Sequence, residues 1–131
     1  MEHFATPLCS KPFVEGLHKG LILFQSCISC SKTQNLSRYR CLQCGATEMI
    51  WRPSSGLGTV EAVTQVRRAA EPFFQALAPY VIVLVHLREG FNLMAIQDPQ
   101  DLRRSHAMQI SDAVRLSVRQ WGERYGFVAS H

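Results

Sequence analysis

Four of the five cysteines form two Cys-x-x-Cys pairs, Cys27–Cys30 and Cys41–Cys44, and ten residues separate the pairs. A tetrahedral Zn²⁺ takes four thiolates at about 2.3 Å, and two facing pairs supply all four from one short stretch. Gly45 follows the second pair and suits the left-handed backbone that often ends such a turn. Ser31 holds this position after the first pair, so we expect that turn to be less regular. The spacing predicts a rubredoxin-like zinc ribbon whose metal ligands are Cys27, Cys30, Cys41 and Cys44.

Two other types of cysteine chemistry compete with zinc. A redox role, with two disulfides or a thioredoxin-like thiol, fits poorly with four cysteines so evenly paired. An iron site of the rubredoxin type shares the tetrahedral sulfur geometry, so the sequence leaves zinc and iron open. A structural zinc contributes ~10–16 kcal/mol to the folding of a small unit, and we therefore expect chelation to unfold the ribbon.

No other residue makes a convincing catalyst. Cys9 lies in a loose N-terminal arm with no local base, so an incidental thiol is the simpler interpretation. His86 stands within an apolar strand, where a hydrogen-bonded barrel histidine is the usual case. His106 and His131 lie near the ends of predicted elements, and nothing in the sequence pairs them. The stretch 54–56 is a turn and not a nucleophile elbow, because no strand-turn-helix surrounds it.

Length and composition bound the fold and the partners. The 131 residues are enough for one compact domain or two very small ones, and 47% of them are hydrophobic. Fourteen basic against ten acidic residues give a net charge of +4, which tolerates an anionic partner without requiring nucleic acid. We find no secretory signal, and the apolar run Tyr80–Leu87 is too short to span a bilayer. Thiolate ligands and an odd free cysteine favour a reducing compartment, so we expect a soluble, cytoplasmic protein.

The elements around the cysteines follow from local signals. An arm at 1–10 leads to a short helix that Ser10 caps and Gly20 ends, with Phe13 and Leu17 on one face. That face has to be buried, either on the ribbon or on a partner protein. Strands at 21–24 and 48–52 flank the cysteines, and we expect Trp51 to close the small core of the ribbon. The predicted units are the arm and helix at 1–20, the ribbon at 21–53 and a barrel at 54–131.

The second half of the chain reads as a five-stranded barrel. From Leu57 the pattern alternates, with Val60, Ala62, Thr64 and Val66 predicted to point one way. A long connection at 69–79 precedes strands at 80–87 and 91–96, which a tight turn joins. Asp98 and Pro99 begin a helix that runs to about His106, and strands follow at 113–119 and 126–129. Three strands, a helix and two strands are the plan of an OB-fold, so we expect a mainly β protein.

Several motifs outside the cysteine pairs occur in a fixed order. They are Pro12-Phe13 with Leu21, Ser55-Gly56-x-Gly58-Thr59-Val60, Pro79-Tyr80-Val81 with Leu87 and Gly90, and Asp98-Pro99-x-Asp101-Leu102. With these motifs the chain, from about residue 12 to its end, resembles the zinc-ribbon/OB-fold proteins associated with acyl-CoA and thiolase-like enzymes. It departs from that family at Ser31, in the ribbon loop at 35–40 and at 105–108. These departures concern loop geometry more than fold.

The resemblance implies a non-catalytic accessory subunit. Such proteins pair with thiolases, thiolase-like aldolases or hydroxymethylglutaryl-CoA synthase, and the partner supplies the catalytic cysteine or base. The chain is similar to the small zinc-finger subunit of 2-benzoylsuccinyl-CoA thiolase, which implies thiolytic cleavage of an aromatic acyl-CoA. We therefore expect a structural Zn²⁺, a hetero-oligomer with a thiolase-like subunit, and acyl-CoA near the shared interface.

Arginine and phenylalanine side chains are the candidates for contacts with CoA or a partner. Guanidinium groups suit the phosphates of CoA, although solvated charge is the simpler interpretation of these arginines: Arg38, Arg40, Arg52, Arg67 and Arg68. Phe73 and Phe74 are adjacent in the long connection, where they would line an acyl tunnel, anchor an interface or pack on the barrel.

A nucleic-acid-binding zinc-ribbon/OB module is the alternative function. Both folds serve that role, and the net charge has the right sign. OB-folds bind single strands by stacking bases on exposed aromatic side chains between basic residues. The first three barrel strands offer only Tyr80 and Phe91 for stacking, without basic residues between them. Binding of single-stranded DNA or RNA at low salt would distinguish the two functions.

Overall fold

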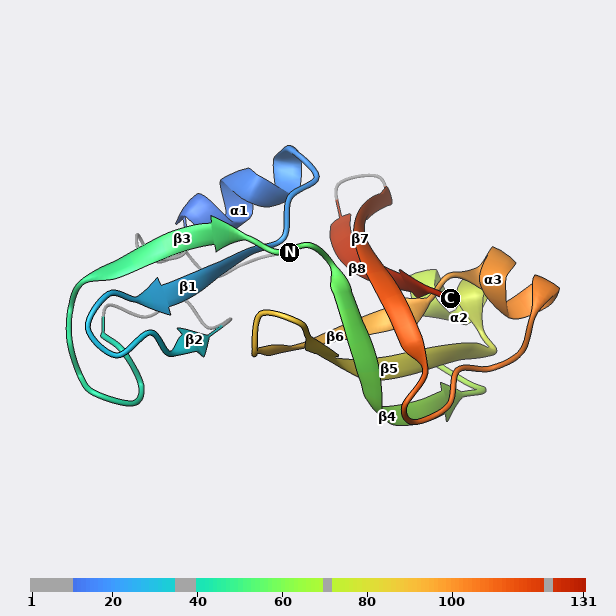
Figure 1. Cartoon of the computed structure of the whole chain (residues 1–131). Helices are drawn as coiled ribbons and strands as arrows, with labels where there is room; N and C mark the ends of the chain where they lie inside the picture. The colour runs from blue at the N-terminus through green and yellow to red at the C-terminus, as the bar shows by residue number, and fades with distance from the viewer. Residues whose placement is uncertain (1–10, 35–39, 70–71, 122–123) are drawn as a thin grey trace.

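The computed structural model describes residues 11–34, 40–69, 72–121 and 124–131. A helix and a small sheet form one end of the molecule, and a barrel forms the other (Figure 1). Strands β2-β1-β3 make the sheet, and β4-β5-β6-β8-β7 close the barrel. In chain order the elements are α1 (Lys11–His18), β1 (Leu23–Cys27), β2 (Thr33–Gln34), β3 (Met49–Pro53), β4 (Leu57–Val66), α2 (Pro72–Leu77), β5 (Tyr80–Leu87), β6 (Asn92–Gln97), α3 (Pro99–Arg104), β7 (Ala113–Trp121) and β8 (Arg124–Ser130).

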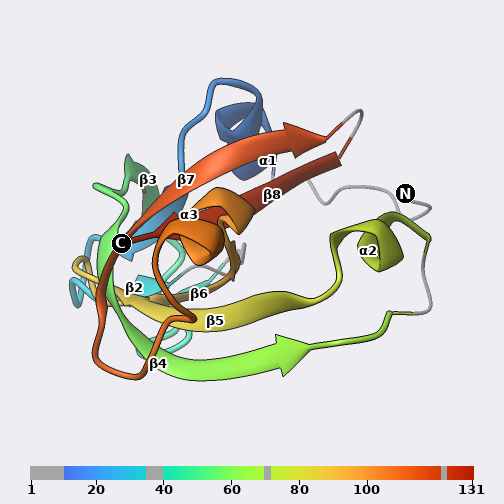
Figure 2. The same ribbon diagram turned by 90° about the vertical axis from the view of Figure 1, so that its right-hand side faces the viewer.

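The predicted fold class is confirmed. The barrel has five strands, and α3 lies between the third and fourth of them, β6 and β7. Strands β6 and β8 pair in parallel, with Ile96 opposite Val128, whereas the other barrel pairs are antiparallel. The β6–β8 and β4–β7 pairs close the barrel over short stretches, Ile96–Gln97 of β6 and Leu57–Thr59 of β4. Figure 2 shows α3 and α2 at different places around the barrel.

Helix α1 packs on its own chain. Phe13 contacts Trp51 of β3 and Phe127 of β8, at ring-centroid distances of 6.4 and 6.2 Å. Gly20, with φ of +76°, ends the helix and its N–H donates to the carbonyl oxygen of Leu17. Phe13 of α1 thus packs against both the ribbon and the barrel, and Trp51 packs against the helix. The predicted cap Ser10 and Cys9 lie outside the described residues.

The helix α3 begins as its sequence predicts. The Asp98 carboxylate accepts a hydrogen bond from the Gln100 N–H at 3.0 Å, and Pro99 occupies the first turn. The helix ends at Arg104, slightly before the predicted end near His106. A further short helix, α2, lies within the predicted connection 69–79. None of the helices in the described segments combines the length and hydropathy needed to cross a bilayer.

A β-bulge makes the predicted alternation in β4 wrong after Val60. Val60 pairs with Val85, but Ala62 pairs with Leu84, so Glu61 is the extra residue. An extra residue moves the side chains that follow it to the opposite face of the sheet. Ala62 and Thr64 are therefore exposed, while Val63 packs against the core.

One hydrophobic core joins the ribbon to the barrel. Phe24 of β1 stacks on Phe91, which precedes β6, at a ring distance of 4.8 Å, and both are buried. The Glu89 carboxylate accepts hydrogen bonds from the Ser54 hydroxyl at 2.7 Å and from the Ser55 N–H at 2.8 Å. The backbone carbonyl oxygen of Glu89 accepts a hydrogen bond from the Thr33 hydroxyl. These contacts fix the β5–β6 turn against the ribbon. The division into units 1–20, 21–53 and 54–131 stays a prediction.

Candidate metal centre and its surroundings

The fold brings the four paired cysteines together. The sulfur atoms of Cys27 and Cys44 lie 3.6 Å apart, as do those of Cys30 and Cys41, and all four lie within 4.8 Å of one another. A tetrahedral ion with ligands at about 2.3 Å separates its sulfurs by roughly 3.8 Å. The described arrangement therefore fits a four-sulfur metal centre without a position for substrate, which is the form of a structural site.

The two cysteine turns have the same backbone geometry. The Ser31 N–H donates to the Cys27 carbonyl oxygen at 2.9 Å, and the Gly45 N–H donates to that of Cys41 at 3.0 Å. The φ angles are +65° at Ser31 and +78° at Gly45. The expectation of an irregular first turn is therefore wrong: Ser31 adopts the left-handed conformation despite its Cβ.

Buried glutamines hold the second turn in place. The Leu42 N–H donates to Gln34 Oε1 at 3.1 Å, and Gln34 Nε2 donates to Gln25 Oε1 at 2.9 Å. Gln25 lies in β1 and Gln34 in β2, and both are buried. The short strand β2 thereby connects the two cysteine turns, although the sequence did not predict it.

The sulfurs are electrostatically suited to a cation. Backbone N–H groups, first that of Cys44 and also that of Gln43, lower the pKa of Cys41 to about 6 against the effect of burial. At Cys30 the Lys32 N–H favours the thiolate, but burial and the neighbouring sulfurs prevail and raise the pKa to about 12. Without an ion, four crowded sulfurs cannot all be thiolates, and a divalent cation removes that conflict.

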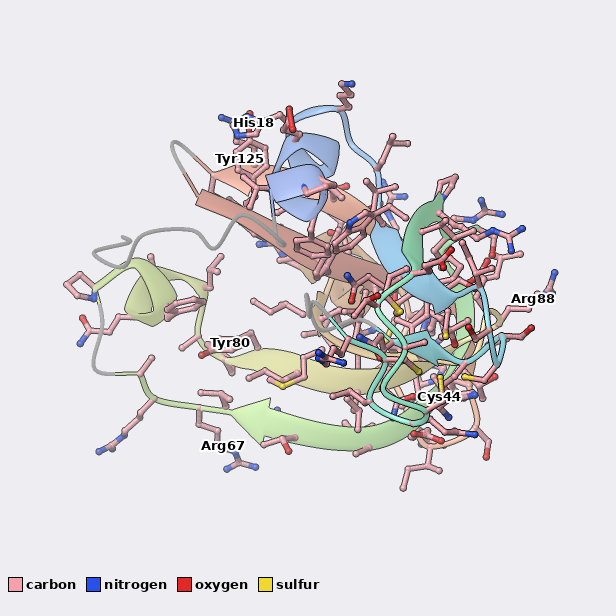
Figure 3. All side chains as sticks on the ribbon, turned by 90° about the vertical axis from the view of Figure 1, so that its left-hand side faces the viewer. His18, Cys44, Arg67, Tyr80, Arg88 and Tyr125 are labelled. Atoms are coloured by element: carbon pink, nitrogen blue, oxygen red, sulfur yellow. The ribbon has the colours of Figure 1, made fainter. Side chains whose placement is uncertain are left out.

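The predicted CoA- or partner-binding residues that the structure describes do not gather at one place. Arg40 donates from Nη1 to the Gly45 carbonyl oxygen at 3.1 Å, so it braces the second cysteine turn. Arg67 and Arg68 are exposed after β4, and Figure 3 shows Arg67 far from Cys44. Phe74 packs against Tyr80 at a ring distance of 5.9 Å. Arg38 and the side chain of Phe73 lie outside what the structure describes.

An open pocket of about 480 Å³ lies between the ribbon and the barrel. It is lined by Lys32, Thr33, Gln34, Leu42, Glu61, His86, Gly90, Phe91 and Asn92. His86 is exposed, and its Nδ1 lies 2.7 Å from Asn92 Oδ1, so it is a hydrogen-bonded histidine on the outer surface of the barrel. Tyr80 and Phe91 are only 8% and 4% exposed, so neither is available to stack on a base.

The structure also gathers a group of residues that the sequence analysis left unpaired. Ligand atoms of His106, Asp112 and His131 lie within 4.8 Å of one another, and Asp101 contacts His131. The four belong to three separate parts of the chain that the barrel closure brings to one end. No spacing rule connects them, and only the strand order of the fold would have brought them together.

Solved structures with the same fold cover nearly the whole chain. A chain described as "Ltp2-ChsH2(DUF35) aldolase" aligns with a TM-score of 0.78 and 21% identity, over 98% of both chains. A protein of unknown function from the DUF35 family of Sulfolobus solfataricus aligns with a TM-score of 0.62 and 12% identity, over 95% of this chain and 87% of that one. No curated protein matches this chain significantly in sequence.

A family model matches residues 51–117, which is just over half of the 131 residues. It describes the C-terminal OB-fold domain of ChsH2. The matched segment begins in β3 and ends within β7, so it includes the β4–β5–β6 part of the barrel and α3. The chain belongs to the family of ChsH2 C-terminal OB-fold domains.

Proposed function

We propose that this chain is a non-catalytic, zinc-binding accessory subunit of a thiolase-type acyl-CoA enzyme. The observation that carries the proposal is a four-cysteine centre fixed to an OB barrel by a single core. The ribbon and the barrel share one buried core, and four cysteines would fill the coordination shell of a tetrahedral ion. The fold matches, over 98% of both chains, that of a chain from an Ltp2-ChsH2(DUF35) aldolase. In this proposal the partner supplies the catalytic groups.

The outer face of β4, β5 and β6 supports docking of a protein partner. Cross-strand pairing places Leu84 beside Met94 and Ile82 beside Ile96 on this face, opposite to the buried valines of β5. Ala62 and Thr64 of β4 extend it. Met94 is 62% exposed, and an exposed apolar patch of this kind marks an interaction surface more often than an ordinary surface.

Acyl-CoA is proposed to bind at the shared interface. Arg67 and Arg68 are exposed at the end of β4, next to the apolar face, and their guanidinium groups suit CoA phosphates. Phe73 and Phe74 belong to α2, which follows these arginines, and are proposed to contact the partner or the acyl group. Arg40 is assigned to the ribbon because it bonds to Gly45. The zinc thiolates suit a cytoplasmic complex.

Co-expression with a thiolase-like subunit tests the proposal. We expect the isolated chain to show no acyl-CoA turnover, and the two chains to elute together from size-exclusion chromatography. Assays of the complex for thiolysis and for aldol cleavage then separate the reaction types, and 2-benzoylsuccinyl-CoA tests the aromatic acyl class. Acyl-CoA turnover by the isolated chain, or a failure to associate with any thiolase-like subunit, would refute the proposal.

A surface variant tests the docking face. Met94→Asp places a charge in the middle of the face, and we expect it to weaken the complex at least tenfold, or about 1.4 kcal/mol. Ile50→Asp is the control, because Ile50 is 42% exposed and belongs to β3 of the ribbon sheet, outside β4, β5 and β6. Equal losses in both variants would assign the effect to general charge, and no loss in Met94→Asp would remove this face from the interface.

A further inference from the structure

A second group of potential metal ligands lies at the end of the barrel that carries α3. His106 follows α3, Asp112 precedes β7 and His131 follows β8. Their ligand atoms all lie within 4.8 Å of one another. His131 Nε2 is 3.1 Å from Asp112 Oδ2, and the rings of His106 and His131 are 5.0 Å apart. Two imidazoles and one carboxylate are a ligand set that divalent transition-metal ions favour.

Asp101 holds His131 in the orientation that a metal-binding histidine needs. His131 Nδ1 lies 2.9 Å from Asp101 Oδ2, and the His131 backbone N–H donates to Asp101 Oδ1 at 3.2 Å. Histidines that bind metals usually donate from their other ring nitrogen to a carboxylate or carbonyl oxygen, which fixes the tautomer. The contact with Asp101 leaves Nε2 directed toward Asp112.

Gln97, which is fully buried, holds this arrangement in place through its side-chain hydrogen bonds. Gln97 Nε2 donates to Asp101 Oδ2 and to the His106 carbonyl oxygen, both at 2.8 Å. Gln97 Oε1 accepts from the Met108 N–H at 2.9 Å. Gln97 is 0% exposed, and its hydrogen bonds fix the loop that carries His106. The residues around the three ligands are therefore positioned before any ion binds.

We propose that His106, Asp112 and His131 form a second metal site, which binds a divalent cation such as Zn²⁺ and leaves further coordination positions to water. It differs from the four-cysteine centre in its ligand chemistry and in its open coordination. Because the ligands are partly exposed, the ion exchanges with solvent, whereas the four-sulfur ion is retained. This inference does not rest on the proposed function, because it concerns only contacts within this chain.

Metal stoichiometry tests the second site. The purified chain is dialysed to equilibrium against a fixed excess of Zn²⁺, and the bound zinc per chain is the difference in zinc content between the protein compartment and the buffer, measured by mass spectrometry. We expect two ions per chain in the parent protein and one in His106→Ala, a variant that removes no contact to Asp101 or Gln97. His86→Ala is the matched control, since it removes another exposed histidine outside the cluster and should keep two ions.

Asp112→Asn separates a metal site from a set of hydrogen bonds. The amide oxygen still accepts from the Gln109 N–H, which lies 2.9 Å from Asp112 Oδ2, so the turn is retained while the anionic ligand is lost. We expect this variant to lose the second ion, and Co²⁺ substitution to lose its second set of visible absorption bands. One ion per chain in the parent, or a second ion retained in His106→Ala, would overturn the proposal.

Discussion

Replacing Ser31 by glycine should strengthen metal binding at the four-cysteine centre. Ser31 has a φ of +65°, a left-handed conformation that costs an L-residue about 1–2 kcal/mol. Glycine removes this cost, but its greater conformational freedom stabilises the unfolded chain by roughly 0.5–1 kcal/mol. The net gain is about 0.5–1 kcal/mol. Because the ribbon folds as it binds its ion, this gain raises zinc affinity by about two- to fivefold.

The reverse change and a neighbouring control make the test specific. Gly45 has a φ of +78°, and a Cβ there would meet nothing within 4 Å, so Gly45→Ser changes only backbone preference and should weaken zinc binding. Ser29→Gly, within the first cysteine pair, adds chain freedom without relieving a positive φ. Zinc affinity is measured by competition with a chromophoric chelator. If Ser31→Gly binds zinc no more tightly than Ser29→Gly, the strain assigned to Ser31 is absent.

Three other predictions follow from contacts in the ribbon and barrel. Purified protein should be colourless with one zinc held by the four cysteines, and a strong chelator should abolish its near-ultraviolet circular dichroism as the ribbon unfolds. Asp98→Asn keeps the helix cap but loses the 2.8 Å ion pair with Arg119, so the free energy of unfolding in urea should fall by about 0.2–1 kcal/mol. Asp98→Ala also removes the cap and should lower the free energy of unfolding by about 1 kcal/mol more. Arg119 holds the pKa of Asp98 low, so the stabilisation is fully present above the ordinary carboxyl pKa of about 4. The loss in Asp98→Asn should shrink as the pH falls below that value and vanish once the pH is below the lowered pKa of the folded protein. Gly56→Ala should unfold at lower urea than Gly45→Ala, because a Cβ at Gly56 would lie 2.6 Å from the Leu116 carbonyl oxygen.

Features that depend on neighbouring residues could be predicted from the sequence. Two Cys-x-x-Cys pairs fix their own turns, so the gathering of the four cysteines follows from their spacing. Asp98 and Pro99 define the start of α3 through a cap and a first-turn proline, and the structure has both. The succession of three strands, a helix and two strands along the chain was predicted from turns and apolar runs, and this succession is the plan of the OB-fold. These signals act over a few residues, so they can be recognised in the sequence without knowledge of the tertiary packing.

The bulge at Glu61 could not be predicted, because the sequence around it alternates as regularly as an uninterrupted strand. Val60, Ala62, Thr64 and Val66 continue a regular alternation, and nothing local marks an extra residue. The barrel core, however, includes Val60 and is packed by Val63, three residues further on. Packing against β5 therefore decides the register, and it exposes Ala62 and Thr64 on the face that we propose for docking.

The histidines at the end of the barrel illustrate a limit of sequence spacing. His106 and His131 are 25 positions apart, and each looks incidental in the chain. They meet because β8 returns beside β6 in parallel, with Gln97 opposite Ala129, which brings the end of β8 to the loop after α3. Such a pair becomes visible only after the strand order is known.

The shared core implies that the metal centre stabilises more than the ribbon. The ribbon side chains Ile22 and Phe24 belong to the same buried cluster as Val85 and Leu87 of β5. Ile22 lies just before β1, the strand that ends at the metal ligand Cys27. If the ion is lost and the ribbon unfolds, Phe91 loses its stacking partner and the end of the barrel is opened to water. Burial of a Phe side chain is worth about 1.5–3 kcal/mol, a large part of the stability of a domain of this size. The metal therefore acts on the barrel through hydrophobic packing, and for this reason we expect the proposed docking face to depend on the ion.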